Sequence, residues 1–153
     1  MTKEDIKILL VDDEKQFVDT LAERLAMRGF EARVAYDGPE ALKAVELPTD
    51  VIVLDLGMDG FEVLRNVKKS NPQVQVIILT GHGGDAEEQT AYRMGAYNFL
   101  RKPMDIEELL SSIRMAYRDK LENAMVAVSM AEGGDFEAAR DVLNEKDLLA
   151  EHK

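Results

Sequence analysis

Five short apolar segments recur along the chain and alternate with segments of helical periodicity. The apolar segments show little alternation with polar positions, which is typical of strands buried on both faces. Between them, apolar residues recur at helical spacing, as with Phe17, Leu21 and Leu25, and Gly29 ends that first helical pattern. The predicted strands are residues 6–11, 31–35, 51–54, 74–79 and 96–100.

Strands and helices therefore follow one another in strict alternation over about 120 residues. Such an order predicts an α/β fold with a parallel sheet, right-handed crossovers and helices on both faces. In folds of this class, the site lies outside the carboxyl ends of the strands. Three of the helices carry a capping-box spacing at their start, with an acidic residue at the N-cap and Glu three positions later: Asp59 with Glu62, Asp85 with Glu88, and Asp105 with Glu108.

Helical spacing continues from residue 104 to about 132, well beyond a normal final helix, until Gly133 and Gly134 break it. Asp135 can cap one more helix, with Phe136 and Leu143 on one face. We therefore divide the chain into a domain over residues 1–122 and a helical extension over residues 123–153. Three roles for the extension stay open: forming a homodimer, covering the domain's own surface, or docking a partner. The apolar stripe of the long helix comprises Ile106, Leu110, Ile113, Tyr117, Leu121, Ala124 and Val128.

Composition narrows the function classes. The 153 residues carry a formal net charge of −11, which disfavours binding to nucleic acid or to an anionic membrane surface. The chain has no cysteine, so disulfides and thiolate chemistry are excluded, and its two histidines cannot form a zinc site alone. The sequence shows no apolar signal core and no apolar run long enough to span a bilayer, so we expect a cytoplasmic protein.

Acidic residues gather at the predicted strand ends. Asp12 and Asp13 follow the first strand and Asp55 follows the third, so a parallel sheet brings all three to one edge. Two carboxylates 4 Å apart repel by roughly 4 kcal/mol at an effective dielectric of 20, unless a cation or proton relieves them. Hard oxygen ligands favour Mg²⁺. Thr80 closes the fourth strand and Lys102 follows the fifth, so a hydroxyl and a positive charge at the same edge can hold phosphoryl oxygens.

Four motifs occur in order along residues 6–121 and together resemble the receiver domain of response regulators in two-component signalling. The resemblance implies a flavodoxin-like sheet with strand order 2-1-3-4-5. It also implies a phosphorylation-dependent switch whose output is a contact with another protein. The motifs are Ile-Leu-Leu-Val-Asp-Asp-Glu at 8–14, Val-Leu-Asp-Leu at 53–56, Ile-Leu-Thr-Gly-His-Gly at 78–83, and Gly-Ala-Tyr-Asn-Phe-Leu-Arg-Lys-Pro at 95–103.

By this resemblance, Asp55 accepts a phosphoryl group from a sensor histidine kinase or a phosphotransfer protein. The resemblance further implies that Asp13, Asp55 and the Gly57 carbonyl bind Mg²⁺ directly, that Asp12 helps through water, and that Thr80 and Lys102 contact the phosphoryl oxygens. Thr80 and Phe99 occupy the positions of the family's switch pair, and the family's Lys-Pro peptide bond is cis. Such a protein is not an enzyme beyond its own phosphorylation and dephosphorylation.

One departure from the family pattern concerns the loop after the acceptor. Receivers usually read Asp-x-x-Met-Pro-Gly-Met-Asp-Gly, whereas here Gly60 follows Asp55 three residues sooner and the proline is missing. The loop carries the Gly57 carbonyl, so an alternative is a pseudo-receiver, an interaction scaffold with an impaired site. A flavodoxin-like or phosphatase enzyme fits less well, because no Asp-x-Asp pattern follows the first strand and no hydroxyl-rich phosphate loop occurs.

Overall fold

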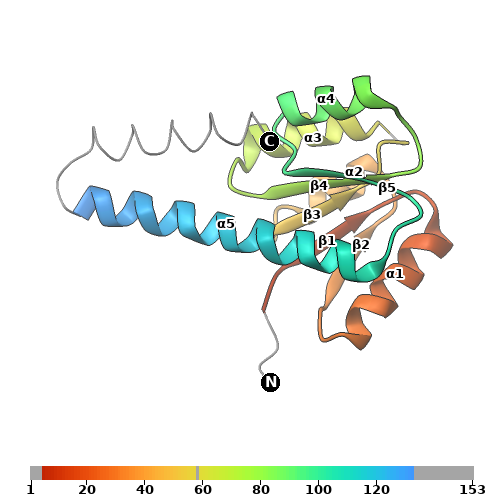
Figure 1. Cartoon of the computed structure of the whole chain (residues 1–153), viewed down its shortest axis with the longest axis horizontal. Helices are drawn as coiled ribbons and strands as arrows, with labels where there is room; N and C mark the ends of the chain where they lie inside the picture. The colour runs from red at the N-terminus through yellow and green to blue at the C-terminus, as the bar shows by residue number, and fades with distance from the viewer. Residues whose placement is uncertain (1–4, 58, 133–153) are drawn as a thin grey trace.

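The structure is a computed structural model that describes residues 5–57 and 59–132. Strands and helices alternate throughout this range, as the apolar pattern predicts (Figure 1). The elements are β1 (Ile8–Val11), α1 (Lys15–Met27), β2 (Ala32–Ala35), α2 (Gly38–Ala44), β3 (Val51–Leu54), α3 (Gly60–Ser70), β4 (Gln75–Thr80), α4 (Asp85–Arg93), β5 (Asn98–Arg101) and α5 (Ile106–Glu132).

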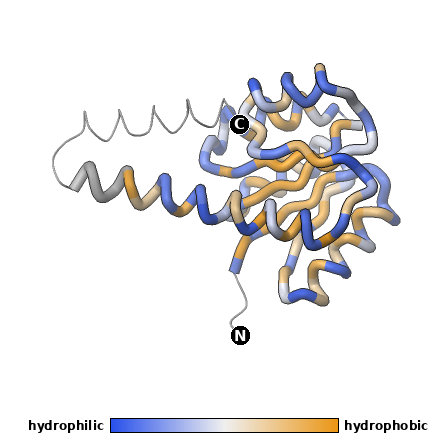
Figure 2. The backbone as a smooth tube through the Cα atoms, in the orientation of Figure 1, coloured by the Kyte–Doolittle hydropathy of each residue, from blue (hydrophilic) through white to orange (hydrophobic). Residues whose placement is uncertain are grey.

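The five strands form one parallel sheet in the order β2-β1-β3-β4-β5, which confirms the predicted topology. Successive residues of β1 enter two different cores: Ile8 and Leu10 pack with α1 and α5, whereas Leu9 and Val11 pack with α2, α3 and α4. Figure 2 shows the resulting apolar centre of the molecule. Burial on both faces explains why the strand sequences lack alternation.

Two of the three predicted capping boxes are wrong in detail. Asp59 precedes α3 in a left-handed conformation (φ 53°) and its side chain makes no cap hydrogen bond. At α4 the cap lies one residue earlier than predicted, since the Gly84 N–H donates to Glu87 Oε2 at 2.9 Å. Asp105 does cap α5, because its Oδ1 accepts from the N–H of Glu107 at 3.2 Å. Exposed carboxylates near a helix start thus compete for the cap, and loop geometry selects among them.

The last described helix, α5, is continuous from Ile106 to Glu132, in agreement with the long helical pattern. Its buried stripe begins at Ile106 and ends at Ala116, after which Leu121 and Met125 are exposed. Figure 1 shows the helix continuing beyond the sheet. The predicted break at Gly133 and the helix after it lie outside the described residues. Within the described part of the chain, no helix is long and apolar enough to cross a membrane.

Candidate functional site

The three carboxylates predicted to converge do so. Asp12 and Asp13 follow β1, Asp55 follows the neighbouring β3, and one oxygen from each lies within 4.8 Å of the others. A hydrogen bond of 3.0 Å from the Asp55 N–H to the Val11 carbonyl extends the pairing of β1 and β3 by one residue and sets the acids side by side. Asp12 and Asp55 are buried, whereas Asp13 is exposed. The site is therefore open to solvent on one side.

Asp55 holds an unsatisfied oxygen at the centre of this cluster. Its side chain is 2% exposed, and Oδ1 has no hydrogen-bond partner among the described residues. Such a buried carboxylate oxygen costs free energy unless a cation or a proton meets it. Three carboxylates with oxygens within 4.8 Å of one another are hard oxygen ligands of the kind that Mg²⁺ takes. The donor set therefore fits Mg²⁺ at Asp12, Asp13 and Asp55.

Lys102 brings the positive charge of the site. Its Nζ donates to Asp12 Oδ2 at 2.7 Å and to Glu14 Oε1 at 3.2 Å, and it lies 3.9 Å from Asp55 Oδ2. Burial acts to lower the pKa of Lys102, but the hydrogen bond to Asp12 and the charges of Asp12 and Asp55 outweigh it and raise that pKa. The Lys102–Pro103 peptide bond is cis. Lys102 is thus held as a cation between Asp12 and Asp55.

Burial raises the pKa of Asp12, whereas it acts to lower the pKa of Lys102. Desolvation raises the pKa of its carboxyl above the usual range, and the nearby charge of Asp55 adds to that rise. The hydrogen bonds from Lys102 and from the Glu14 N–H, the latter at 2.9 Å, act against it. Lys102 and the Glu14 N–H therefore do not fully compensate the negative charge of Asp12, which again favours a cation at this edge of the sheet.

Thr80 and Phe99, the predicted switch pair, lie on the neighbouring strands β4 and β5. Thr80 ends β4 and is 1% exposed, and its Oγ1 accepts from the His82 N–H at 3.1 Å. Phe99 lies on the neighbouring β5, paired with Ile78, and is buried among residues that pack against α3 and α4. The Phe99 N–H donates to the Tyr92 hydroxyl at 3.1 Å, which links α4 to the strand. The aromatic ring is thus turned inward.

The short loop after Asp55 brings the start of α3 against the backbone of Asp55. A Cβ added at Gly60 would lie 2.6 Å from the Asp55 carbonyl oxygen, so only glycine fits there without movement. A Cβ at Gly57 would meet His82 Cδ2 at 3.1 Å and Asp55 Oδ2 at 3.2 Å. Gly57 is not among the described glycines with positive φ. The left-handed residue of the loop is Asp59 instead.

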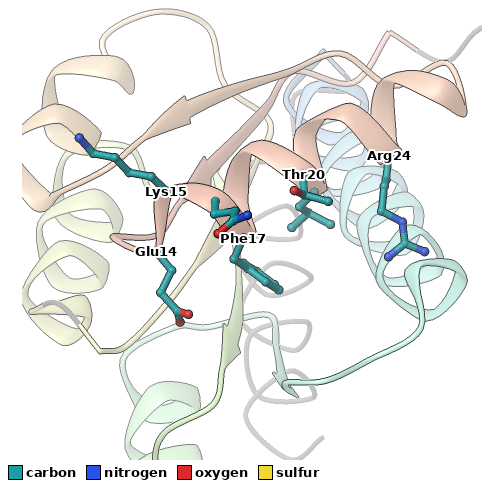
Figure 3. A pocket seen from close by; sticks show the side chains of 7 residues that line it. Glu14, Lys15, Phe17, Thr20 and Arg24 are labelled. Atoms are coloured by element: carbon teal, nitrogen blue, oxygen red, sulfur yellow. The ribbon is translucent and has the colours of Figure 1, made fainter.

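A groove of about 560 Å³ runs along the exposed face of α1 beside the site. Figure 3 shows Phe17 and Glu14 among its labelled side chains. Both also contact Lys102, since its Nζ lies 4.1 Å from the centre of the Phe17 ring and 3.2 Å from Glu14 Oε1. The sequence motifs did not identify either residue as part of the site. Glu14 stands in the first motif, but Phe17 looked like one more member of an apolar helical stripe.

The fold and these acids together define a doubly wound α/β protein with a candidate divalent-cation site at the carboxyl edge of its sheet. The family model of the response regulator receiver domain matches residues 8–114, and the chain belongs to this family. Receiver domains of response regulators belong to phosphorylation-dependent two-component signalling, and they are signalling proteins rather than enzymes in the usual sense.

Several characterised proteins are similar to this chain. The transcriptional regulatory protein CpxR of Klebsiella pneumoniae is 36% identical over 115 residues, which are 73% of this chain and 49% of CpxR. The crystal structure of NtrX from Brucella abortus superposes with a TM-score of 0.79 at 32% identity, over 84% of this chain and 30% of NtrX. The beryllofluoride-activated receiver domain dimer of NtrC4 superposes with a TM-score of 0.69 at 36% identity, over 74% of this chain and 98% of that domain.

The chain thus spans about half the length of CpxR and less than a third of NtrX. The transcriptional role in CpxR's name belongs to that whole protein. This chain shares only the receiver domain with it. The family membership confirms the receiver fold inferred from the four motifs. The individual roles of Asp12, Asp13, Asp55, Thr80 and Lys102 stay predictions.

Proposed function

We propose that this chain is a receiver that accepts a phosphoryl group on Asp55 from a histidine kinase or a phosphotransfer protein and relays its state by contact with another protein. The observation that carries the proposal is the Asp55 carboxylate, which is buried yet has an oxygen without a hydrogen-bond partner in the described structure. A carboxylate kept unsatisfied beside a lysine and two other acids is arranged for a reaction rather than for stability.

The transfer joins the phosphohistidine of a partner protein to groups at this edge of the sheet. One Asp55 oxygen attacks the phosphorus of a phosphohistidine, the phosphorus–nitrogen bond breaks, and the histidine nitrogen leaves with the bonding electron pair and takes up a proton. Lys102, now 3.9 Å from Asp55 Oδ2, stabilises the charge that spreads over the phosphoryl oxygens. The Thr80 hydroxyl accepts from the His82 N–H, so its own proton is free to be donated to a phosphoryl oxygen.

The residues that would hold Mg²⁺ are Asp12, Asp13 and Asp55 together with the Gly57 carbonyl. When bound, Mg²⁺ supplies charge neutralisation for the acids and for the phosphoryl oxygens. Among the described residues, Asp12 and Glu14 orient Lys102, and Gly60, which has no Cβ, allows α3 to approach the Asp55 backbone closely.

The phosphoryl state reaches the surface, in this proposal, through Thr80 and Phe99. A Thr80 hydroxyl drawn toward the phosphoryl group changes the packing behind it, where Phe99 is held by Tyr92 of α4. Helix α4 and strand β5 then form the output surface. A second copy of the chain is the partner that we propose for the extension over residues 123–153.

A pseudo-receiver remains the second candidate, and the shortened loop is the observation that favours it. Mass spectrometry after incubation with acetyl phosphate and Mg²⁺ separates the two. We expect one labile phosphate on the wild-type chain and on Asp50→Asn, whose carboxylate binds Lys120 and the Lys7 N–H away from the site. We expect none on Asp55→Asn. A wild-type chain that gains no phosphate and does not bind beryllofluoride would identify a pseudo-receiver.

A further inference from the structure

Phe17 lies against the charge that the proposed reaction uses. The Lys102 Nζ is 4.1 Å from the centre of the Phe17 ring, within the range of a cation–π contact. Among the described residues, three other lysine or arginine side chains approach an aromatic ring, at 5.1 to 5.2 Å. Phe17 is half-buried and lines the groove of α1 (Figure 3), so one part of its ring contacts Lys102 while another part remains open to solvent.

The ring limits where the ammonium group can go. A lysine side chain has four rotatable bonds and loses considerable entropy when it is fixed. Here the charged end has Asp12 at 2.7 Å, Glu14 at 3.2 Å and Asp55 Oδ2 at 3.9 Å, and Glu14 is exposed. Without the ring, the exposed Glu14 can draw Lys102 outward. With the ring, the ammonium is also shielded from water, which strengthens its interaction with anionic oxygens at the site.

We infer that Phe17 is a positioning residue that holds Lys102 within reach of a phosphoryl group on Asp55. The inference rests on the proposed function, because it assigns to Lys102 the role of binding phosphoryl oxygens. It gives Phe17 a role besides filling the core between α1 and the sheet.

Two variants, one without the ring and one that keeps it, test the inference. Phe17→Leu keeps an apolar side chain but removes the ring, whereas Phe17→Tyr keeps the ring and adds a hydroxyl to a side chain that is only half-buried. The affinity for beryllofluoride with Mg²⁺ and the rate of phosphorylation by acetyl phosphate are measured for both variants and for the wild type. From the size of cation–π contacts, we expect Phe17→Leu to lose about 3- to 10-fold in each, and Phe17→Tyr to stay within about twofold of wild type.

A second measurement needs no phosphoryl group. In the NMR spectrum of the unphosphorylated chain, the ε-methylene protons of Lys102 should be shifted upfield by the ring, in the wild type and in Phe17→Tyr but not in Phe17→Leu. Thermal melting shows whether each variant is folded. If the wild type binds beryllofluoride and all three proteins show equal affinities, rates and Lys102 shifts, the positioning role is refuted while the proposed function stands. If the wild type neither binds beryllofluoride nor gains a phosphate, both are refuted.

Discussion

Replacing Asp55 by Asn should stabilise the fold when divalent cations are removed. The side chain is 2% exposed and its Oδ1 has no hydrogen-bond partner in the described structure. Asp55 also lies in a cluster in which oxygens of Asp12, Asp13 and Asp55 all fall within 4.8 Å. An amide has nearly the same shape but no charge, so it removes the repulsion with little change in packing.

The magnitude follows from three contributions. At an effective dielectric of 20, Asp12 and Asp55, whose oxygens lie within 4.8 Å of each other, repel by at least about 3.5 kcal/mol, and Lys102 at 3.9 Å attracts Asp55 by about 4.3 kcal/mol. These two nearly cancel. Burying the charged carboxylate without a partner for Oδ1 costs ~1–3 kcal/mol more than burying a neutral amide in the same place, and Asp13, which is exposed, adds a screened repulsion. The expected gain for Asp55→Asn is therefore about 1–2 kcal/mol in the free energy of unfolding.

Urea denaturation in chelator and in excess Mg²⁺ measures this gain. Mg²⁺ at a hundred times its dissociation constant should stabilise the wild type by about 2.7 kcal/mol and reverse the order of the two proteins. Asp50→Asn is the matched control, because Asp50 is paired with Lys120 and accepts from the Lys7 N–H. It should lower stability equally in both media. Equal stability of wild type and Asp55→Asn in chelator, or a lower stability of Asp55→Asn, would refute the converging acids as a source of strain.

Three further predictions concern other parts of the chain. Gly60→Ala should destabilise the fold by about 1–3 kcal/mol in urea denaturation, because its Cβ would meet the Asp55 carbonyl at 2.6 Å. Gly81→Ala is the control and should stay near wild type, because its Cβ would lie 3.9 Å from the nearest atom. Equal denaturation midpoints for the two variants would contradict the tight approach at Gly60. Burial raises the pKa of Tyr97, and the hydrogen bond to Asp119 at 2.7 Å raises it further. The protonated Tyr97 hydroxyl therefore stabilises the fold below pH 10, and this stabilisation is lost as the pH rises further. Tyr97→Phe should therefore be less stable at neutral pH by about 1 kcal/mol and fall less steeply in melting temperature above pH 10; parallel curves would contradict this. Deleting residues 123–153 should leave a folded, monomeric receiver, whereas the full chain elutes as a dimer in light scattering; a monomeric full chain at high micromolar concentration would exclude the homodimer.

The amino-acid sequence predicts the sheet and the placement of its acids for a simple physical reason. Strands buried on both faces have continuous apolar sequences, and parallel connections bring their carboxyl ends to one edge. Asp12, Asp13 and Asp55 could therefore be placed together before any contact was known. The bounds were less accurate: the first strand was predicted from residue 6 and begins at Ile8, and the cap of α4 shifted by one residue.

Only the tertiary structure shows which partner each side chain takes. Lys102 and Asp12 are 90 positions apart, and nothing in local sequence indicates that Lys102 lies closer to Asp12 than to Asp55. Phe17 matches the helical core pattern equally well whether or not a lysine lies over its ring. The sequence by itself determined the fold and the edge that carries the chemistry, because periodicity and chain order are local properties. The contacts within the site depend on side chains from separate elements meeting in three dimensions, and the folded structure alone decides those.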